Sequence, residues 1–165
     1  MGVVREETYI EKDYIKSLYD PVNRLNKYLK TQHLSLSAAE YRDDVIDVAW
    51  VLFQYNKSAA RGNDLWSVNM LHHVMIHLAR VLFHRYNPNR AQLGLKTIEM
   101  SLEENLRVKI RDIYQNITPY DHSNAVKLIK EVVSDEADWI LSNLEEGDHI
   151  KAFFKKMISP TNQHT

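Results

Sequence analysis

Residues 69–85 read NMLHHVMIHLARVLFHR, and they hold four of the eight histidines of the chain. Apolar side chains recur in this stretch at spacings of three and four, which predicts a helix with one buried side. The other edge carries histidine and arginine, where surface helices usually carry lysine and glutamate. At about 100° per residue, six side chains from this helix fall along that edge. We call them the polar stripe: Trp66, Asn69, His73, His77, Arg80 and His84.

The helical pattern begins before the polar stripe. Ser37 and Glu40, three residues apart, form a capping-box pattern that opens a helix extending to about residue 56. Gly62 then interrupts the pattern, and Asn63 or Asp64 can cap the helix that carries the stripe and ends near residue 86. Two long helices joined by so short a connection are expected to pack antiparallel.

The second half of the chain continues in the same way. Residues 87–94 are predicted to be a loop. The helix that follows this loop is expected to be interrupted near Ser101, because Ser101 and Glu104 offer a second capping box. With only four glycines and four prolines, long helices are favoured over a strand-and-turn fold. We expect an all-α fold, an antiparallel bundle of four to five main helices with a short extended N-terminal segment. Its later helices are predicted over about 95–117, 122–144 and 149–158.

The first 33 residues differ from the bundle. A β-like run at 15–19 leads into an Asp20-Pro21 turn, and a short helix is predicted over 22–30. A lone strand cannot pair its own edges, so it needs a sheet from elsewhere. We therefore expect residues 1–33 to be the remnant of a further domain or the linker to one. The bundle would then occupy residues 37–158, with a tail at 159–165.

Composition excludes several classes of protein. The chain has no cysteine, so it has no disulfide framework, no thiol catalysis and no cysteine-ligated metal. Its formal net charge of −1 does not provide the basic field typical of nucleic-acid binding. The start of the chain lacks an apolar signal core, and no run approaches the roughly 18 apolar residues of a membrane span. We expect a cytoplasmic protein without membrane association.

An acidic face on the preceding helix matches the polar stripe. Asp43 and Asp47 lie one turn apart on that face. An antiparallel hairpin folded about residues 59–60 would place Asp47 near His72 and His73, and Asp43 near His77. A carboxylate beside a histidine fixes the ring, favours its charged form and is also a possible metal-binding arrangement.

Four roles for the polar stripe compete. Two histidines four residues apart can share a metal ion, but the zincin pattern needs glutamate where this helix has Val74. General acid/base catalysis by one histidine would lack a recognisable nucleophile to act on. The stripe would otherwise be the wall of a substrate site, where Arg80 and the histidines meet polar or anionic groups, or a polar seam between helices without a ligand.

Two stretches carry a resemblance to a known family. SLYDPVNRLNKYL, at 17–29, is followed at 39–90 by two helical segments joined through an Arg61-Gly62 turn. This order of features resembles the C-terminal half of the aminoglycoside/lincosamide-type nucleotidyltransferases, over about residues 15–144. The resemblance implies a helical bundle that packs beside a nucleotidyltransferase domain, forms one wall of the substrate cleft and often mediates dimerisation.

The resemblance also implies what this chain lacks. The catalytic domain of the family keeps a Gly-Ser and paired-aspartate signature, which holds Mg²⁺ and the nucleoside triphosphate. That signature is absent from this sequence. We therefore expect this chain to bind neither and to transfer no nucleotide alone. It would be an excised domain, a truncated product or a stand-alone subunit, and its partners would be a catalytic domain in cis or in trans and a second copy.

The same resemblance implies a small-molecule antibiotic as the substrate and assigns roles to the polar stripe. Arg80 would pair with a phosphate or carboxylate, the histidines would hydrogen-bond substrate hydroxyls, and Trp66 would pack on an apolar face of the substrate. The implied substrate-binding residues are Trp66, Asn69, His73, His77, Arg80 and His84, with Asp43 and Asp47 beside them.

Two alternatives belong to other classes of protein. The bundle is similar in architecture to stand-alone HEPN-type proteins, which are RNase toxins or partners of a minimal nucleotidyltransferase. RNase members carry arginine, four to six residues and then histidine, whereas Arg80 and His84 have three residues between them and Val81 follows the arginine. The other alternative is a plain metal-binding bundle.

Overall fold

The computed structural model describes residues 34–159. Within this range the protein is all-α, as predicted, and no residue forms a strand. Five of the helices are longer than ten residues, which agrees with the expected four to five. The extended run, turn and helix predicted for residues 1–33, and the tail after 159, lie outside the described residues. The elements are α2 (Ala38–Ala59), α3 (Asp64–Tyr86), the 3-10 helix η1 (Pro88–Thr97), α4 (Ile98–Ser101), α5 (Glu104–Asn116), α6 (His122–Ser142) and α7 (Asp148–Ile158).

The first two described helices begin at the predicted caps. The Ser37 side chain accepts a hydrogen bond from the Glu40 amide at 3.2 Å, and the Glu40 carboxylate accepts one from the Ser37 amide at 2.8 Å. Asn63 caps α3, because its side-chain oxygen accepts from the Trp66 amide at 3.3 Å. Each cap satisfies an amide that the helix itself leaves without a partner.

The region after α3 differs from the prediction in two respects. Residues 88–97 form a 3-10 helix instead of a loop. The helix predicted over 95–117 is interrupted near Ser101, as expected, because the chain turns extended at Leu102 and the region divides into α4 and α5. The proposed box of Ser101 and Glu104 does not form, and α5 starts after Glu103 without a side-chain cap. Ile98 and Leu102, on either side of this break, are both buried in the core.

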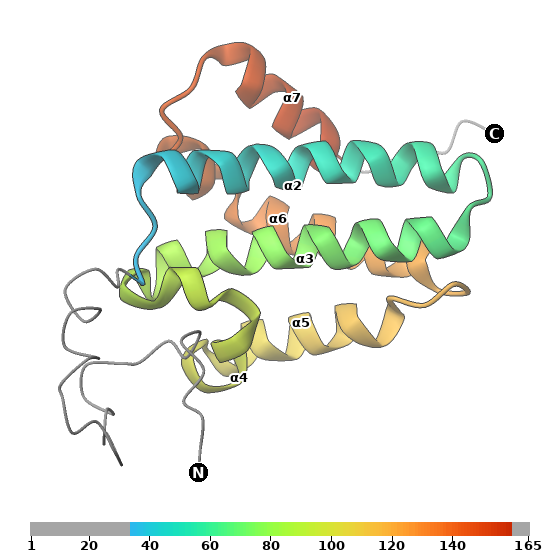
Figure 1. Ribbon diagram of the computed structural model, residues 1–165, viewed down its shortest axis with the longest axis horizontal. Helices are drawn as coiled ribbons and strands as arrows, with labels where there is room; N and C mark the ends of the chain where they lie inside the picture. The colour runs from blue at the N-terminus through green and yellow to red at the C-terminus, as the bar shows by residue number, and fades with distance from the viewer. Residues whose placement is uncertain (1–33, 160–165) are drawn as a thin grey trace, which may run out of the picture. The chain divides into compact units, whose positions relative to one another are not determined.

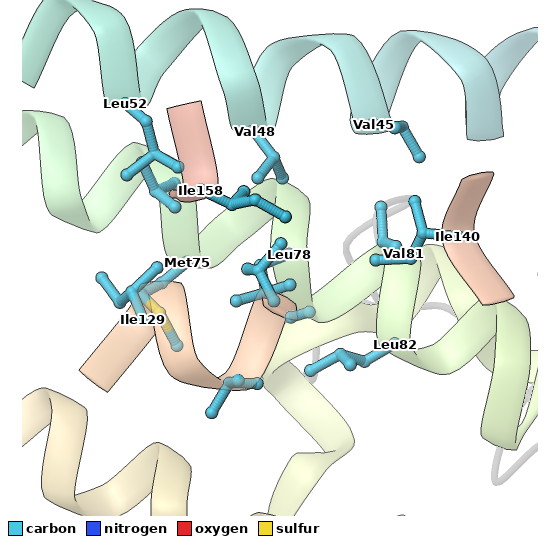
Figure 2. Close-up of a cluster of buried hydrophobic side chains, with 14 of the residues drawn as sticks. Val45, Val48, Leu52, Met75, Leu78, Val81, Leu82, Ile129, Ile140 and Ile158 are labelled. Carbon is cyan, nitrogen blue, oxygen red and sulfur yellow. The ribbon is translucent and has the colours of Figure 1, made fainter. Parts of the chain in front are cut away.

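Helix α3 lies at the centre of the bundle, between α2 and α5 (Figure 1). It packs against α2, η1 and α6, while α5 packs mainly on α6, and α7 covers α2 and α6. Side chains from α2, α3, α6 and α7 meet in the core between these helices (Figure 2). The labelled members of this cluster are Val45, Val48, Leu52, Met75, Leu78, Val81, Leu82, Ile129, Ile140 and Ile158. Among the described helices, none combines the length and the apolar character required to span a membrane.

Gly94 lets η1 approach α3 closely. Its φ of 49° and ψ of −126° lie in a region that residues with a side chain rarely adopt. A Cβ at this position would lie 3.1 Å from Cγ of Arg80, which is closer than ordinary van der Waals contact. Gly94 therefore fixes the path of η1 and also shapes the surroundings of a residue of the polar stripe.

We expect Gly94→Ala to lower the free energy of unfolding by about 2–3 kcal/mol, from backbone strain plus the contact with Arg80. Gly62→Ala is the matched control, since Gly62 also has a positive φ, of 65°, but a Cβ there would meet no atom within 4 Å. Urea unfolding of both variants measures the difference. An equal loss of unfolding free energy in the two variants would show that the contact between a Cβ at position 94 and Arg80 does not destabilise the fold.

Candidate functional site

A buried carboxylate anchors the middle of the polar stripe. Asp44 of α2 is only 5% exposed, and its Oδ1 accepts a hydrogen bond from Nδ1 of His77 at 2.9 Å. Arg80 is its second partner, with Nε 3.1 Å from Oδ2. The N–H of Arg80 does not point along this line, so the contact is an ion pair without a hydrogen bond. Asp44 thus holds two stripe residues against α2.

The structure corrects the pairing predicted for the acidic face. Asp43, expected beside His77, is 61% exposed and pairs with Arg42 on its own helix. Asp47, expected near His72 and His73, instead has its Oδ2 3.8 Å from Nδ1 of His77. The turn between the helices extends to residue 63, which shifts the register from the one a hairpin about residues 59–60 would have.

Asp44 was missed because a carboxylate is usually assigned to the surface. Its spacing could have revealed it, since Asp44 is three residues after Tyr41 and four before Val48. Both of those neighbours are buried, so Asp44 occupies a core position in the helical repeat. A charged residue at such a position needs a partner, and His77 and Arg80 provide it.

The last residue of the stripe lies beside two aromatic rings that also contact each other. The ring of His84 stacks on Tyr41 with centroids 4.3 Å apart, and Trp139 of α6 lies 6.2 Å away. Nδ1 of His84 is buried and has no hydrogen-bond partner. Burial lowers the pKa of His84, because the charged imidazolium is disfavoured away from water.

A buried ion pair that sequence reasoning missed holds this end of α3 to α6. Glu136 is largely buried and accepts from Arg85 at 2.5 Å and from the hydroxyl of Tyr86 at 2.7 Å. Burial, followed by the hydrogen bond to Glu136, raises the pKa of Tyr86 to about 12. The Arg85 guanidinium also lies 5.5 Å from the centre of the Trp139 ring. No local pattern signals these contacts, since the partners are 50 or more residues apart.

The first half of the stripe is open to solvent. Trp66 is 53% exposed, His73 is exposed and Asn69 is half-buried. Trp50 of α2 is 49% exposed, and the antiparallel register set by the pair of Asp44 and His77 places it near the level of Leu71, between Asn69 and His73. Two indole rings and several uncharged polar groups therefore face solvent along neighbouring helices.

The six residues of the polar stripe thus divide into two sets, and the two predicted aspartates lie outside both. His77, Arg80 and His84 are engaged by partners within the bundle, whereas Trp66, Asn69 and His73 are accessible to a ligand. Asp43 lies apart from the stripe, and Asp47 lies beside it at the level of His77.

The accessible part of the polar stripe offers groups that can bind a ligand. In residues 34–159, no group of three or more histidine, aspartate or glutamate side chains is close enough to hold a metal ion. The accessible residues offer imidazole, amide and indole groups, which hydrogen-bond and stack on a ligand. His77, Arg80 and His84 contact other helices and so hold this surface in place.

The chain was compared with protein families, curated proteins and solved structures. No family model, curated protein or solved structure matches it. The resemblance to nucleotidyltransferases therefore stays a prediction that depends on the quoted residues.

We expect Asp44→Ala to lower the free energy of unfolding by about 2 kcal/mol, because His77 loses its hydrogen-bond acceptor and Arg80 loses its ion-pair partner. Asp43→Ala is the matched control and should change it by less than about 0.5 kcal/mol, since Asp43 is exposed. Chemical denaturation measures both variants. Equal losses in the two would mean that the buried pairing adds no stability.

The lowered pKa of His84 predicts a loss of stability in acid. The unfolded chain binds a proton at a higher pH than the folded one does, so His84 opposes folding increasingly as the pH falls through and below about 6.5. We expect His84→Phe to reduce the drop in thermal midpoint between about pH 7.5 and pH 5. The exposed His73→Phe variant is the control. If His73→Phe reduced the drop in thermal midpoint as much as His84→Phe does, the loss of stability in acid would not come from the burial of His84.

Proposed function

We propose that this chain is a substrate-binding and dimerisation domain that works with an antibiotic-type nucleotidyltransferase catalytic domain, supplied in cis or in trans. In this proposal the catalytic domain carries Mg²⁺ and the nucleoside triphosphate, and nucleotide is transferred to a hydroxyl of a small molecule. The chain contributes one wall of the site in which that molecule is held.

One observation carries the proposal. Trp66, Asn69 and His73 lie on the central helix of the bundle, yet the other helices leave this segment of its edge uncovered. The next part of the same edge is held by Asp44, so the open segment is attached to a rigid base. A rigid and uncovered polar surface with aromatic groups is typical of a binding site.

The accessible residues suggest how the substrate would be held. The indole of Trp66 would pack on an apolar face, and the His73 imidazole and the Asn69 amide would bind hydroxyl groups. Arg80 is a weaker candidate for a substrate phosphate, because its side chain is only 29% exposed and lies against the buried Asp44. The proposal therefore depends mainly on the accessible set.

The test combines the full chain with catalytic domains that carry the Gly-Ser and paired-aspartate signature, Mg²⁺, a labelled nucleoside triphosphate and a panel of lincosamides and aminoglycosides. We expect transfer of label only when both proteins are present. Transfer by no pairing, or equal transfer without this chain, contradicts the proposal.

Variants of the chain separate substrate binding from general support of the partner. Trp66→Ala should raise KM by about tenfold with little change in kcat, because a contact made equally in the ground and transition states affects binding alone. Met100→Ala is the control, since Met100 is a highly exposed apolar residue on α4, away from the stripe. If both variants shifted KM alike, the stripe would not be the substrate wall.

A further inference from the structure

A hollow lies where α4 and the end of η1 face α5. In Figure 1, α5 lies on the other side of α3 from α2. Its volume is about 470 Å³, which is within the range of small-molecule sites. The walls are mainly apolar, from Leu95, Ile98, Ile110 and the ring of Tyr114. This hollow shares no lining residue with the polar stripe.

The hollow follows from the way α5 is placed. Because α5 packs mainly on α6, it meets α3 through side chains, as where the rings of Tyr114 and His72 lie 6.1 Å apart. The break at Leu102 sends α4 and α5 in different directions. A hollow is left between them, and the side chains of Leu95, Ile98, Ile110 and Tyr114 line it.

Polar groups at the rim are arranged to donate hydrogen bonds. Arg111 donates from Nε to Glu99 at 3.0 Å and also from Nη2 to the other oxygen of the same carboxylate. A guanidinium has five N–H groups, so three remain for a ligand. The Arg111 side chain is 53% exposed, so the N–H groups that do not pair with Glu99 can reach a further partner. Gln115 adds an amide at the same rim.

We propose that this hollow binds a small aromatic carboxylic acid, with its flat apolar body between Ile98 and Tyr114 and its carboxylate on Arg111. The apolar walls bury the ring, and arginine pairs with a planar carboxylate through two parallel hydrogen bonds. A ligand with a positive group would instead face the guanidinium of Arg111. The site is independent of the polar stripe and of any nucleotidyltransferase partner.

The test uses 2-naphthoate as the probe and isothermal titration calorimetry on the full chain alone. We expect saturable binding of one 2-naphthoate per chain, and binding at least tenfold weaker for 2-naphthylmethylamine, the analogue of opposite charge. Absence of saturable 2-naphthoate binding, or a preference for the amine, overturns the proposal. The measurement needs no catalytic domain, so it stands or fails separately from the proposed function.

Two variants locate the binding. Arg111→Gln should weaken 2-naphthoate by about tenfold through loss of a charged hydrogen-bond donor, while Glu99→Gln should not weaken it. Leu95→Trp should abolish binding by filling the hollow, with the thermal midpoint checked to show that the variant folds. Arg111 is exposed, so its substitution remains informative if Leu95→Trp does not fold. Binding that survives Arg111→Gln unchanged overturns the proposal.

Discussion

The burial of α3 is the constraint on which the rest of the structure depends. Its apolar side chains pack against α2 on one side and against α6 and η1 on others, and many of them are completely buried. Since these contacts set the rotation of α3 about its own axis, they also set the direction of every polar group on it. The polar stripe is the edge of α3 that does not take part in these apolar contacts.

Packing around that edge gives the stripe two different halves. Near its end, Tyr41 and Trp139 enclose His84, and the close approach of Gly94 confines Arg80. Near its start, no comparable side chain covers Trp66 or His73, and both face solvent. One end of this helix edge thus contacts other helices of the bundle, and the other end is available to a ligand. The buried Asp44 lies at the boundary between the two.

The two surfaces available for binding have different origins. The open part of the stripe exists because α2 and α3 bury their apolar sides inward and leave their polar sides outward. The hollow beside α5 exists because the chain turns at Leu102, between α4 and α5, and α5 packs mainly on α6 and not on α3. Ligands of different chemistry suit them, since the stripe offers uncharged polar and indole groups while the hollow offers apolar walls and a guanidinium.

The sequence by itself determined the helical class, the caps at Ser37 and Asn63 and the apolar side of α3, because these depend on residues within one or two helical turns of each other. The sequence also identified the polar stripe, although not which half of it would contact other helices. Only the tertiary structure decided that Asp44, and not Asp43, meets His77. That choice depends on the register of two helices across a turn, and neighbouring residues on a helix point about 100° apart. The path of the chain at Leu102 was likewise decided by the tertiary structure, since the capping box that the sequence offers at Ser101 and Glu104 does not form there.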